Sequence, residues 1–329
     1  MTLQEKSPGA ELVFNAGLDS LILWNILHYI TWPYTYALNT VYMLISYKNL
    51  LSICGNLLVI ISIVYFKQLH TPTNSLILSL AVADLLVGAL VSPLTIKYSS
   101  TVCHYHYDLF CKVRGTFDVS LCTCSILNLC CISIDRYYAV CQPLTYTAKI
   151  NHCVIVIMIL MSWGVSALIG ISLTTVSIQR KICDKTCLNN VVLVNIMGLI
   201  FAFYLPMIVM LCIYLKIFLV AQKQARSIQN TASGAAVIRM ERKATKTLAI
   251  VMGFFLMCWL PFFLTSTIFS FSNASLPDAV LELLNWVALS NSMLNPFIYA
   301  FFYSWFRSAF RMIISGKIFL GDCTNLKLS

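Results

Sequence analysis

The chain contains seven stretches of about twenty or more residues in which apolar side chains predominate. A helix needs about 20 such residues to cross the hydrocarbon core of a bilayer, which is roughly 30 Å thick. Each stretch is therefore long enough for one membrane-spanning helix. Lys48 lies inside the first stretch, so that span begins either at about 38 or after Lys48, at about 49. The stretches lie at about 38–66, 73–97, 112–138, 152–176, 191–218, 245–271 and 279–303.

The composition agrees with a membrane protein. Of the 329 residues, 59% are hydrophobic and only 10% are charged, whereas soluble domains carry about 25% charged residues. A water-soluble chain of this length would have to hide more apolar surface than its interior can hold. We therefore expect an all-α membrane protein that folds as a seven-transmembrane helix bundle.

A shorter segment at about 305–318 follows the last apolar stretch. One helix face carries the apolar residues Phe306, Phe310, Ile313 and Ile314. The other face carries Arg307 and Arg311. This pattern indicates a short amphipathic eighth helix that lies in the membrane interface. The expected organisation is an N-terminal extracellular segment at 1–37, the seven-transmembrane bundle at 38–304, and a cytoplasmic amphipathic helix with the tail at 305–329.

The net charge of +10 comes largely from basic residues in one polar interval and after the last stretch. Such residues mark cytoplasmic flanks, so we expect lipid and not nucleic acid as the partner of this charge. The N-terminus is then extracellular and the chain a multi-pass plasma-membrane protein. Asn273 heads an acceptor sequence for glycosylation and would lie in an outer loop. The basic residues of the interval are Lys216, Lys223, Arg226, Arg239, Arg242, Lys243 and Lys246.

Three acidic residues, Asp84, Asp118 and Asp135, lie well within the predicted spans. A charged side chain in a bilayer is costly and usually has a specific partner. Each of the three can be a packing residue satisfied by its neighbours, or a functional group. Asp135 precedes Arg136 at the inner end of the third span, where the pair can be interfacial. Alternatively, Glu241 at the start of the sixth span can hold Arg136 in a releasable lock.

Asp84 and the seventh span supply a second group of polar residues. Oxygen ligands suit hard cations, so this network can hold Na⁺, although a purely structural role is the alternative. We expect no other metal and no resident cofactor. The predicted sodium network is Asp84, Asn291, Ser292 and Asn295.

Two prolines lie inside predicted membrane helices next to bulky side chains. Pro261 follows Trp259 in the sixth span, and Pro296 precedes Tyr299 in the seventh. Proline removes a helical hydrogen bond and kinks the helix. These sites are candidate hinges.

The motifs fall one set per span, in order. They are Asn56 in "GN", Asp84 in "LAVAD", "DRY" at 135–137, Trp163, Pro206, "CWLP" at 258–261 and "NPFIY" at 295–299. Over about residues 50–318 the chain thus closely resembles the rhodopsin-like G-protein-coupled receptors. The resemblance implies roles in activation and G-protein coupling for Asp135, Arg136, Tyr137, Tyr214, Glu241, Pro261, Pro296 and Tyr299.

Asp118 precedes Arg136 by 18 residues, which is about 27 Å along a helix. It therefore lies near the outer surface, where a small cation can reach it. "NSMLNPFIYAFFYSWF" at 291–306 narrows the resemblance to the trace amine-associated receptors. That family implies a receptor for small protonated amines that pair with this Asp. It also implies a stimulatory G protein, a rise in cyclic AMP and an olfactory role.

The same resemblance implies a ligand pocket and a disulfide between Cys111 and Cys187. The aromatic residues of the pocket can form a cage around an ammonium group, or they can simply be core. The fifth helix has Gly198, Leu199 and Ala202 where catechol-binding receptors carry serines. Leu289 replaces a Tyr that usually supports the carboxylate. The pocket residues are Asp118, Val119, Cys122, Thr123, Trp259, Phe262, Phe263, Asn285, Trp286 and Leu289.

Three alternatives to an amine receptor follow from the same residues. The chain can be an orphan or non-amine receptor of the same fold, with Asp118 a remnant. An ion-coupled transporter is disfavoured because the chain has no repeated halves. An enzyme is not expected, because no catalytic Ser/His/Asp set or metal-ligand spacing occurs.

Overall fold

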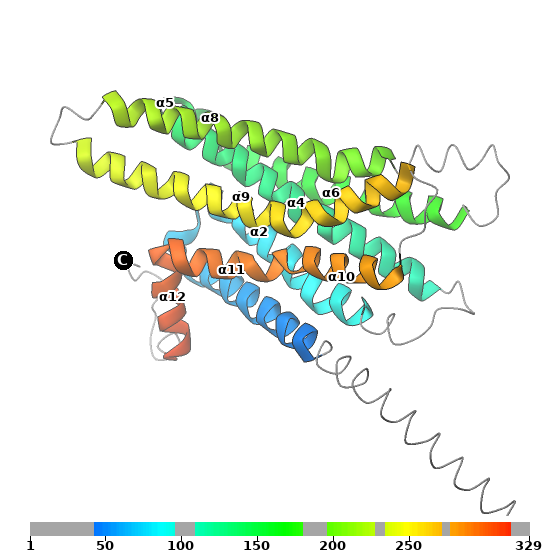
Figure 1. Ribbon diagram of the computed structural model, residues 1–329. Coiled ribbons are helices and arrows are strands. Elements are labelled where there is room, and N and C mark those ends of the chain that lie inside the picture. Colours follow the sequence, from blue (N-terminus) through cyan, green and yellow to red (C-terminus); the bar gives the residue numbers. More distant parts are fainter. Residues whose placement is uncertain (1–42, 96–108, 180–195, 228–233, 272–276, 317–329) are drawn as a thin grey trace, which may run out of the picture. The chain divides into compact units, whose positions relative to one another are not determined.

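The computed structural model describes residues 43–95, 109–179, 196–227, 234–271 and 277–316, which are helical almost throughout. Contacts divide the chain into two units, Met1–Tyr47 and Lys48–Ser329. In the first unit, the described residues 43–47 are helical. In the second unit, long helices run side by side as a bundle (Figure 1).

Six helices are long and apolar enough to cross a membrane, and they match the first six predicted stretches. The first contains Lys48, so this span begins before that residue. They are Met43–Tyr65, Pro72–Thr95, Val113–Cys141, His152–Thr175, Ile196–Lys223 and Ile250–Phe269.

These spans contain the following elements. The second consists of α2 (Pro72–Leu86) and the π-helical turn η2 (Val87–Val91), while the third and fourth lie within α4 (Leu109–Cys141) and α6 (His152–Gln179). The fifth contains the π-helical turn η3 (Ile200–Tyr204) and α8 (Leu205–Ser227), and the sixth lies within α9 (Gly234–Phe271).

The seventh predicted span is divided between α10 (Asp278–Leu289) and α11 (Asn291–Phe302). Pro296 has no N–H, so the carbonyl of Ser292 loses its partner within the helix. Asn56 Nδ2 donates to that carbonyl at 3.0 Å, which replaces the missing bond from the first helix. The seven-helix class is thus confirmed, with its last span built from two short helices.

Helix α4 is the central helix of the bundle. It packs against α2, α6 and α8, and its side chains Cys124, Ile126 and Asn128 are completely or almost completely buried. The same helix carries Asp118 and Asp135, so the core of the bundle also positions two of the three acids.

The predicted eighth helix is α12 (Ser304–Ile314), which turns away from the direction of α11 (Figure 1). Phe306 and Ala309 are buried, and Ala309 packs near η1 (Lys67–Leu69). Arg307 Nη1 donates to the carbonyls of residues 300 and 301 at 3.1 Å, which satisfies the end of α11. Phe310 and Ile314 stay exposed, as an interfacial helix requires.

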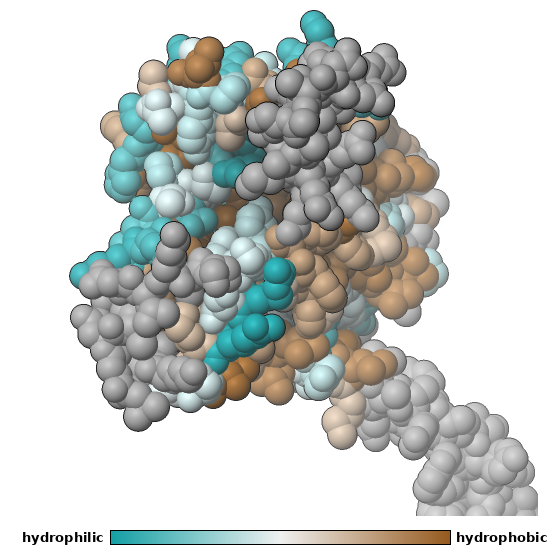
Figure 2. Space-filling model, turned by 90° about the vertical axis from the view of Figure 1, so that its left-hand side faces the viewer, coloured by the Kyte–Doolittle hydropathy of each residue, from teal (hydrophilic) through white to brown (hydrophobic). Residues whose placement is uncertain are grey.

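Large hydrophobic side chains also cover the outer faces of the spanning helices. On α6, Leu160 and Leu168 are 65% and 67% exposed. Figure 2 shows hydrophobic surface beside the hydrophilic residues that gather on the end face of the bundle. Such exposure is unfavourable in water but suits contact with lipid.

Gly170 is the point of closest approach between α6 and α4. A Cβ atom on Gly170 would clash with Ser120 Oγ and would lie 2.9 Å from the Thr116 carbonyl oxygen. The backbone oxygen cannot rotate away. We therefore expect Gly170→Ala to separate the helices and to cost about 1–3 kcal/mol of stability, measured by thermal denaturation of the purified protein in detergent.

Gly164→Ala on the same helix is the matched control. A Cβ atom there meets nothing within 4 Å, so the melting temperature should be unchanged or slightly higher. Equal melting temperatures for the two variants would contradict the close packing of α6 on α4.

Candidate functional site

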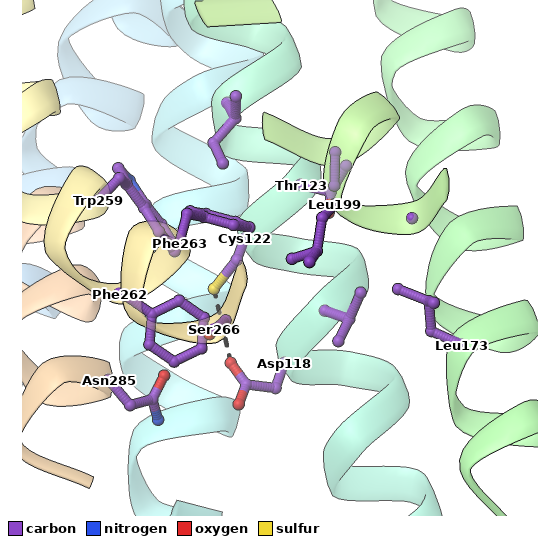
Figure 3. Close-up of a pocket in the computed structure, with 14 residues that line it drawn as sticks. Asp118, Cys122, Thr123, Leu173, Leu199, Trp259, Phe262, Phe263, Ser266 and Asn285 are labelled. Atoms are coloured by element: carbon purple, nitrogen blue, oxygen red, sulfur yellow. Dashed lines mark hydrogen bonds between the residues drawn. The ribbon is translucent and has the colours of Figure 1, made fainter. Parts of the chain in front are cut away.

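A cavity of about 300 Å³ lies among α4, α6, the fifth span, α9 and α10 (Figure 3). Helix α4 supplies its polar side and α9 most of its aromatic side. The lining residues are Asp118, Val119, Cys122, Thr123, Ile126, Leu173, Gly198, Leu199, Ala202, Trp259, Phe262, Phe263, Ser266 and Asn285.

The aromatic wall of the cavity is held by ring packing. Phe203, which is fully buried, stacks on Phe263 with ring centroids 4.1 Å apart. Phe263 in turn lies 5.7 Å from Trp259 and 5.5 Å from Phe262. The wall is therefore closely packed and apolar, and it presents aromatic rings to the cavity.

Among the described residues that line this cavity, Asp118 is the only one with a formal charge. Cys122 Sγ donates to its Oδ1 at 3.5 Å, the contact drawn in Figure 3. Arg114 Nη2 lies 3.8 Å from its Oδ2, one helical turn away, and the two side chains are only 17% and 18% exposed. The carboxylate is thus desolvated and already has an internal cation beside it.

Eight of the ten predicted pocket residues meet at this cavity: Asp118, Val119, Cys122, Thr123, Trp259, Phe262, Phe263 and Asn285. Trp286 and Leu289 do not line it and are 9% and 2% exposed. Asn285, the residue before Trp286 in α10, does line the cavity. A role for Trp286 and Leu289 in ligand binding stays a prediction.

Sequence reasoning missed several residues of this region. Ile126, Leu173 and Ser266 line the cavity, and only the packing of helices brings them there. Arg114 had a detectable signal, because a cation four residues before an acid on a helix is an ion-pair spacing.

Asp84 is fully buried in a second polar cluster. Its Oδ1 accepts from Ser125 Oγ at 2.9 Å, and its Oδ2 accepts from Asn295 Nδ2 at 2.6 Å. Asn291 and Ser292 are also buried. All four predicted residues therefore lie in the bundle core, and Ser125 from α4 joins them.

The first helix adds two buried side-chain oxygens to the bundle core. Asn56 Oδ1 and Ser52 Oγ are buried with no hydrogen-bond partner within the described part of the chain. Carboxylate, hydroxyl and amide oxygens are the donors that hard cations prefer. The donor set around Asp84 therefore fits a small cation such as Na⁺.

A third cluster surrounds Asp135, which is fully buried. Arg136 donates to Asp135 Oδ2 from Nε at 3.0 Å and from Nη2 at 2.6 Å. Thr73 Oγ1 donates to the same oxygen at 2.9 Å, and the Tyr146 hydroxyl donates to Oδ1 at 2.9 Å. Tyr146 lies on α5 (Pro143–Lys149). Burial raises the pKa of Tyr146, so this phenol keeps its proton at neutral pH.

The other residues predicted for activation are distributed around this cluster. The Tyr214 hydroxyl lies 2.7 Å from Ser133 Oγ, and the ring of Tyr137 lies 6.0 Å from Lys216 Nζ. Tyr299 is buried with Phe306 in one core cluster. Pro261 and Pro296 lie inside α9 and α11.

Some predicted contacts fall outside the described residues. Glu241 lies in α9 and Cys111 in α4, but their side chains are not among those described, and Cys187 and Asn273 lie in undescribed segments. The Arg136–Glu241 lock, the disulfide and the glycosylation site therefore stay predictions.

Tyr146→Phe removes a hydrogen bond to a buried carboxylate. We expect it to cost about 1–3 kcal/mol, because bonds to charged groups are stronger than neutral ones, and to lower the melting temperature in detergent. Tyr137→Phe is the control, since the Tyr137 hydroxyl makes no hydrogen bond among the described residues. Equal melting temperatures would contradict a structural role for the bond between Tyr146 and Asp135.

The amino-acid sequence is similar to a known family of membrane receptors. The family model for the 7 transmembrane receptor (rhodopsin family) matches residues 55–299. These limits include Asp84 and Asp135 with their hydrogen-bond partners, and every described residue that lines the cavity.

Individual relatives match over most of the chain. Trace amine-associated receptor 1 of Macaca mulatta is 42% identical over 310 residues, which cover 88% of this chain and 91% of the relative. Trace amine-associated receptor 9 of Mus musculus is 42% identical over 322 residues, covering 91% and 90%. Trace amine-associated receptor 4 of Mus musculus is 40% identical over 306 residues, covering 87% and 88%.

Proposed function

The chain belongs to the rhodopsin family of seven-transmembrane receptors and, within it, to the trace amine-associated receptors, and on this premise we propose that its ligand is a small protonated amine. Membership makes it a G-protein-coupled receptor with a ligand and a G protein as partners, and not an enzyme or a transporter.

The position of Asp118 carries the proposal. A desolvated carboxylate in a cavity whose other described lining residues are uncharged favours a cationic ligand, because an ion pair is stronger where water is excluded. Trp259, Phe262 and Phe263 line the same space. Their rings can add cation–π attraction of roughly 0.5–2 kcal/mol per contact.

The fifth span indicates what the rest of the ligand is like. Gly198, Leu199 and Ala202 line the cavity and offer no side-chain hydroxyl. Ligands with an apolar body are therefore favoured over catechols, whose hydroxyls would lose hydrogen bonds to water without gaining protein partners.

The proposal extends to signalling. A ligand that moves Trp259 acts directly beside Pro261, whose kink allows α9 to pivot. That motion reaches the end of the bundle where Asp135 holds Arg136. We propose a stimulatory G protein, a rise in cyclic AMP and an olfactory role, which rest on the family resemblance. We also propose a plasma-membrane location with the N-terminus outside.

Asp118→Asn keeps the shape of the side chain and removes its charge. In cells that express the chain at their surface, 2-phenylethylamine should raise cyclic AMP through the wild type. The variant should need at least about a hundredfold higher concentration, since a desolvated ion pair is worth several kcal/mol. Asp118→Glu, which keeps the charge, should lose less.

An equal response from wild type and Asp118→Asn would contradict the ion pair. A silent wild type across primary, tertiary and di-amines, with surface expression confirmed, would contradict amine binding altogether. Leu289, where relatives that bind amines usually have a Tyr, would then favour uncharged ligands.

We also propose that Na⁺ binds at Asp84, with Ser125 and Asn295 as further ligands. A cation there would stabilise one arrangement of the helices and so change agonist potency. Replacing NaCl by KCl at constant ionic strength should shift the half-maximal agonist concentration of the wild type but not of Asp84→Asn. An unchanged potency in the wild type would contradict a functional Na⁺ site.

A further inference from the structure

Leu173 of α6 fills the space beside a glycine of the fifth span. A Cβ atom on Gly198 would lie 2.6 Å from Leu173 Cδ2, 2.9 Å from its Cδ1 and 3.1 Å from its Cγ. These distances are shorter than carbon–carbon contacts, so the leucine side chain rests where a larger residue at 198 would place its own. Both residues line the cavity, and Figure 3 shows Leu173 projecting from its helix toward that space.

The backbone that carries Leu173 is held against α4. Thr174 Oγ1 donates to the Gly170 carbonyl oxygen at 2.8 Å and lies 2.9 Å from Thr116 Oγ1 of α4. Gly170 itself packs so closely on α4 that a Cβ atom there would lie 2.9 Å from the Thr116 carbonyl oxygen. A helix held in this way closes only partly on space that a shortened side chain leaves. The size of side chain 173 therefore changes the size of the cavity.

The aromatic wall of the cavity is less able to change. Phe263 stacks on Phe203 and also packs against Trp259, and Phe203 is fully buried. A ring supported from behind moves only if the packed core moves with it. The wall at Gly198, in contrast, is completed by the end of one flexible aliphatic side chain.

From this packing, and resting on the proposed amine receptor, we infer that Leu173 is a specificity-determining residue that limits the length of the amine. The ammonium group pairs with Asp118, and the apolar body extends toward Leu173 and Gly198. The preferred ligand is then a short arylalkylamine, because a longer homologue must displace Leu173 from its place beside the glycine.

Three homologous probes test the inference: 2-phenylethylamine, 3-phenylpropylamine and 4-phenylbutylamine. They carry the same ammonium group and the same ring, and they differ only in the number of methylene groups between the two. Cyclic AMP responses are measured for the full chain and its variants, with surface expression measured for each. The readout is the half-maximal concentration of the longest probe divided by that of the shortest, in which differences in expression cancel.

We expect the wild type to respond best to 2-phenylethylamine. Leu173→Ala removes about three carbon atoms from the wall. The ratio should then fall about tenfold, because each methylene that gains an apolar environment is worth about fourfold in affinity. Leu173→Val should shift the ratio in the same direction by less, and it tests the inference if Leu173→Ala does not reach the surface.

Gly198→Ala is the complementary change. Its Cβ atom would displace Leu173 and narrow the cavity, so the ratio should rise. In the Leu173→Ala background the displaced side chain is absent, and Gly198→Ala should have little effect, since residues in contact are not additive. Leu168→Ala is the matched control on α6. Leu168 is 67% exposed, so its truncation should leave the ratio unchanged.

The contrary outcomes are distinct. If amines act and the ratio is unchanged in Leu173→Ala, or the wild type already prefers 4-phenylbutylamine, the length limit is refuted and the amine receptor stands. If Gly198→Ala raises the ratio equally in both backgrounds, it does not act through Leu173 and the assignment fails. If no probe acts on a receptor present at the surface, the inference and the proposed amine binding both fail.

Discussion

The cost of an ionised carboxylate in an apolar helix bundle is the constraint on which this structure depends. Water is not available to solvate such a group in the membrane, so protein groups or ligands must replace it. Asp84, Asp118 and Asp135 satisfy this requirement in three different ways. Asp84 accepts from neutral hydroxyl and amide donors, and Asp135 is held by Arg136, Thr73 and Tyr146.

Asp118 is the least satisfied of the three. Its partners are a thiol at 3.5 Å and a guanidinium at 3.8 Å, both long for strong hydrogen bonds. A group that is desolvated but loosely paired gains most from an incoming cation. This difference in satisfaction supports the proposal that Asp118, and not Asp84 or Asp135, is the carboxylate that pairs with the ligand.

Backbone carbonyl groups inside the membrane also need hydrogen-bond partners. Pro296 removes a hydrogen bond inside α11, and Asn56 donates to the carbonyl that is left. The first and seventh helices are thereby joined at the point where the seventh is broken. A proline kink inside a membrane is tolerated when another group replaces the missing hydrogen bond. Asn56 therefore compensates for the hydrogen bond that Pro296 removes.

Much of the fold could be predicted from the sequence, because membrane thickness fixes the length of an apolar helix. The spans and the amphipathic helix follow from length and periodicity alone. The hydrogen bond from Asn56 to the Ser292 carbonyl could not be predicted, because it joins two helices that are far apart in the sequence. At the site, Asp118 stood out as an acid in an apolar stretch, whereas Leu173 and Ser266 have no local signal.

The remaining differences concern how the side chains of α10 pack against the rest of the bundle. Trp286 and Leu289 were assigned to the pocket by resemblance, yet the structure buries them outside the cavity lining. Lys48 could be seen in the sequence only as a misplaced charge at a span boundary. Its position over Trp286 emerges when the first helix and α10 pack together.

The most direct measurement is an electron cryomicroscopy structure of the chain with 2-phenylethylamine and a G protein. The ligand ammonium is predicted to lie about 3 Å from an Asp118 carboxylate oxygen, with Arg114 moved away from that oxygen. A ligand bound elsewhere, or bound in the cavity while Arg114 remains on Asp118, would contradict the role of this carboxylate as the amine site.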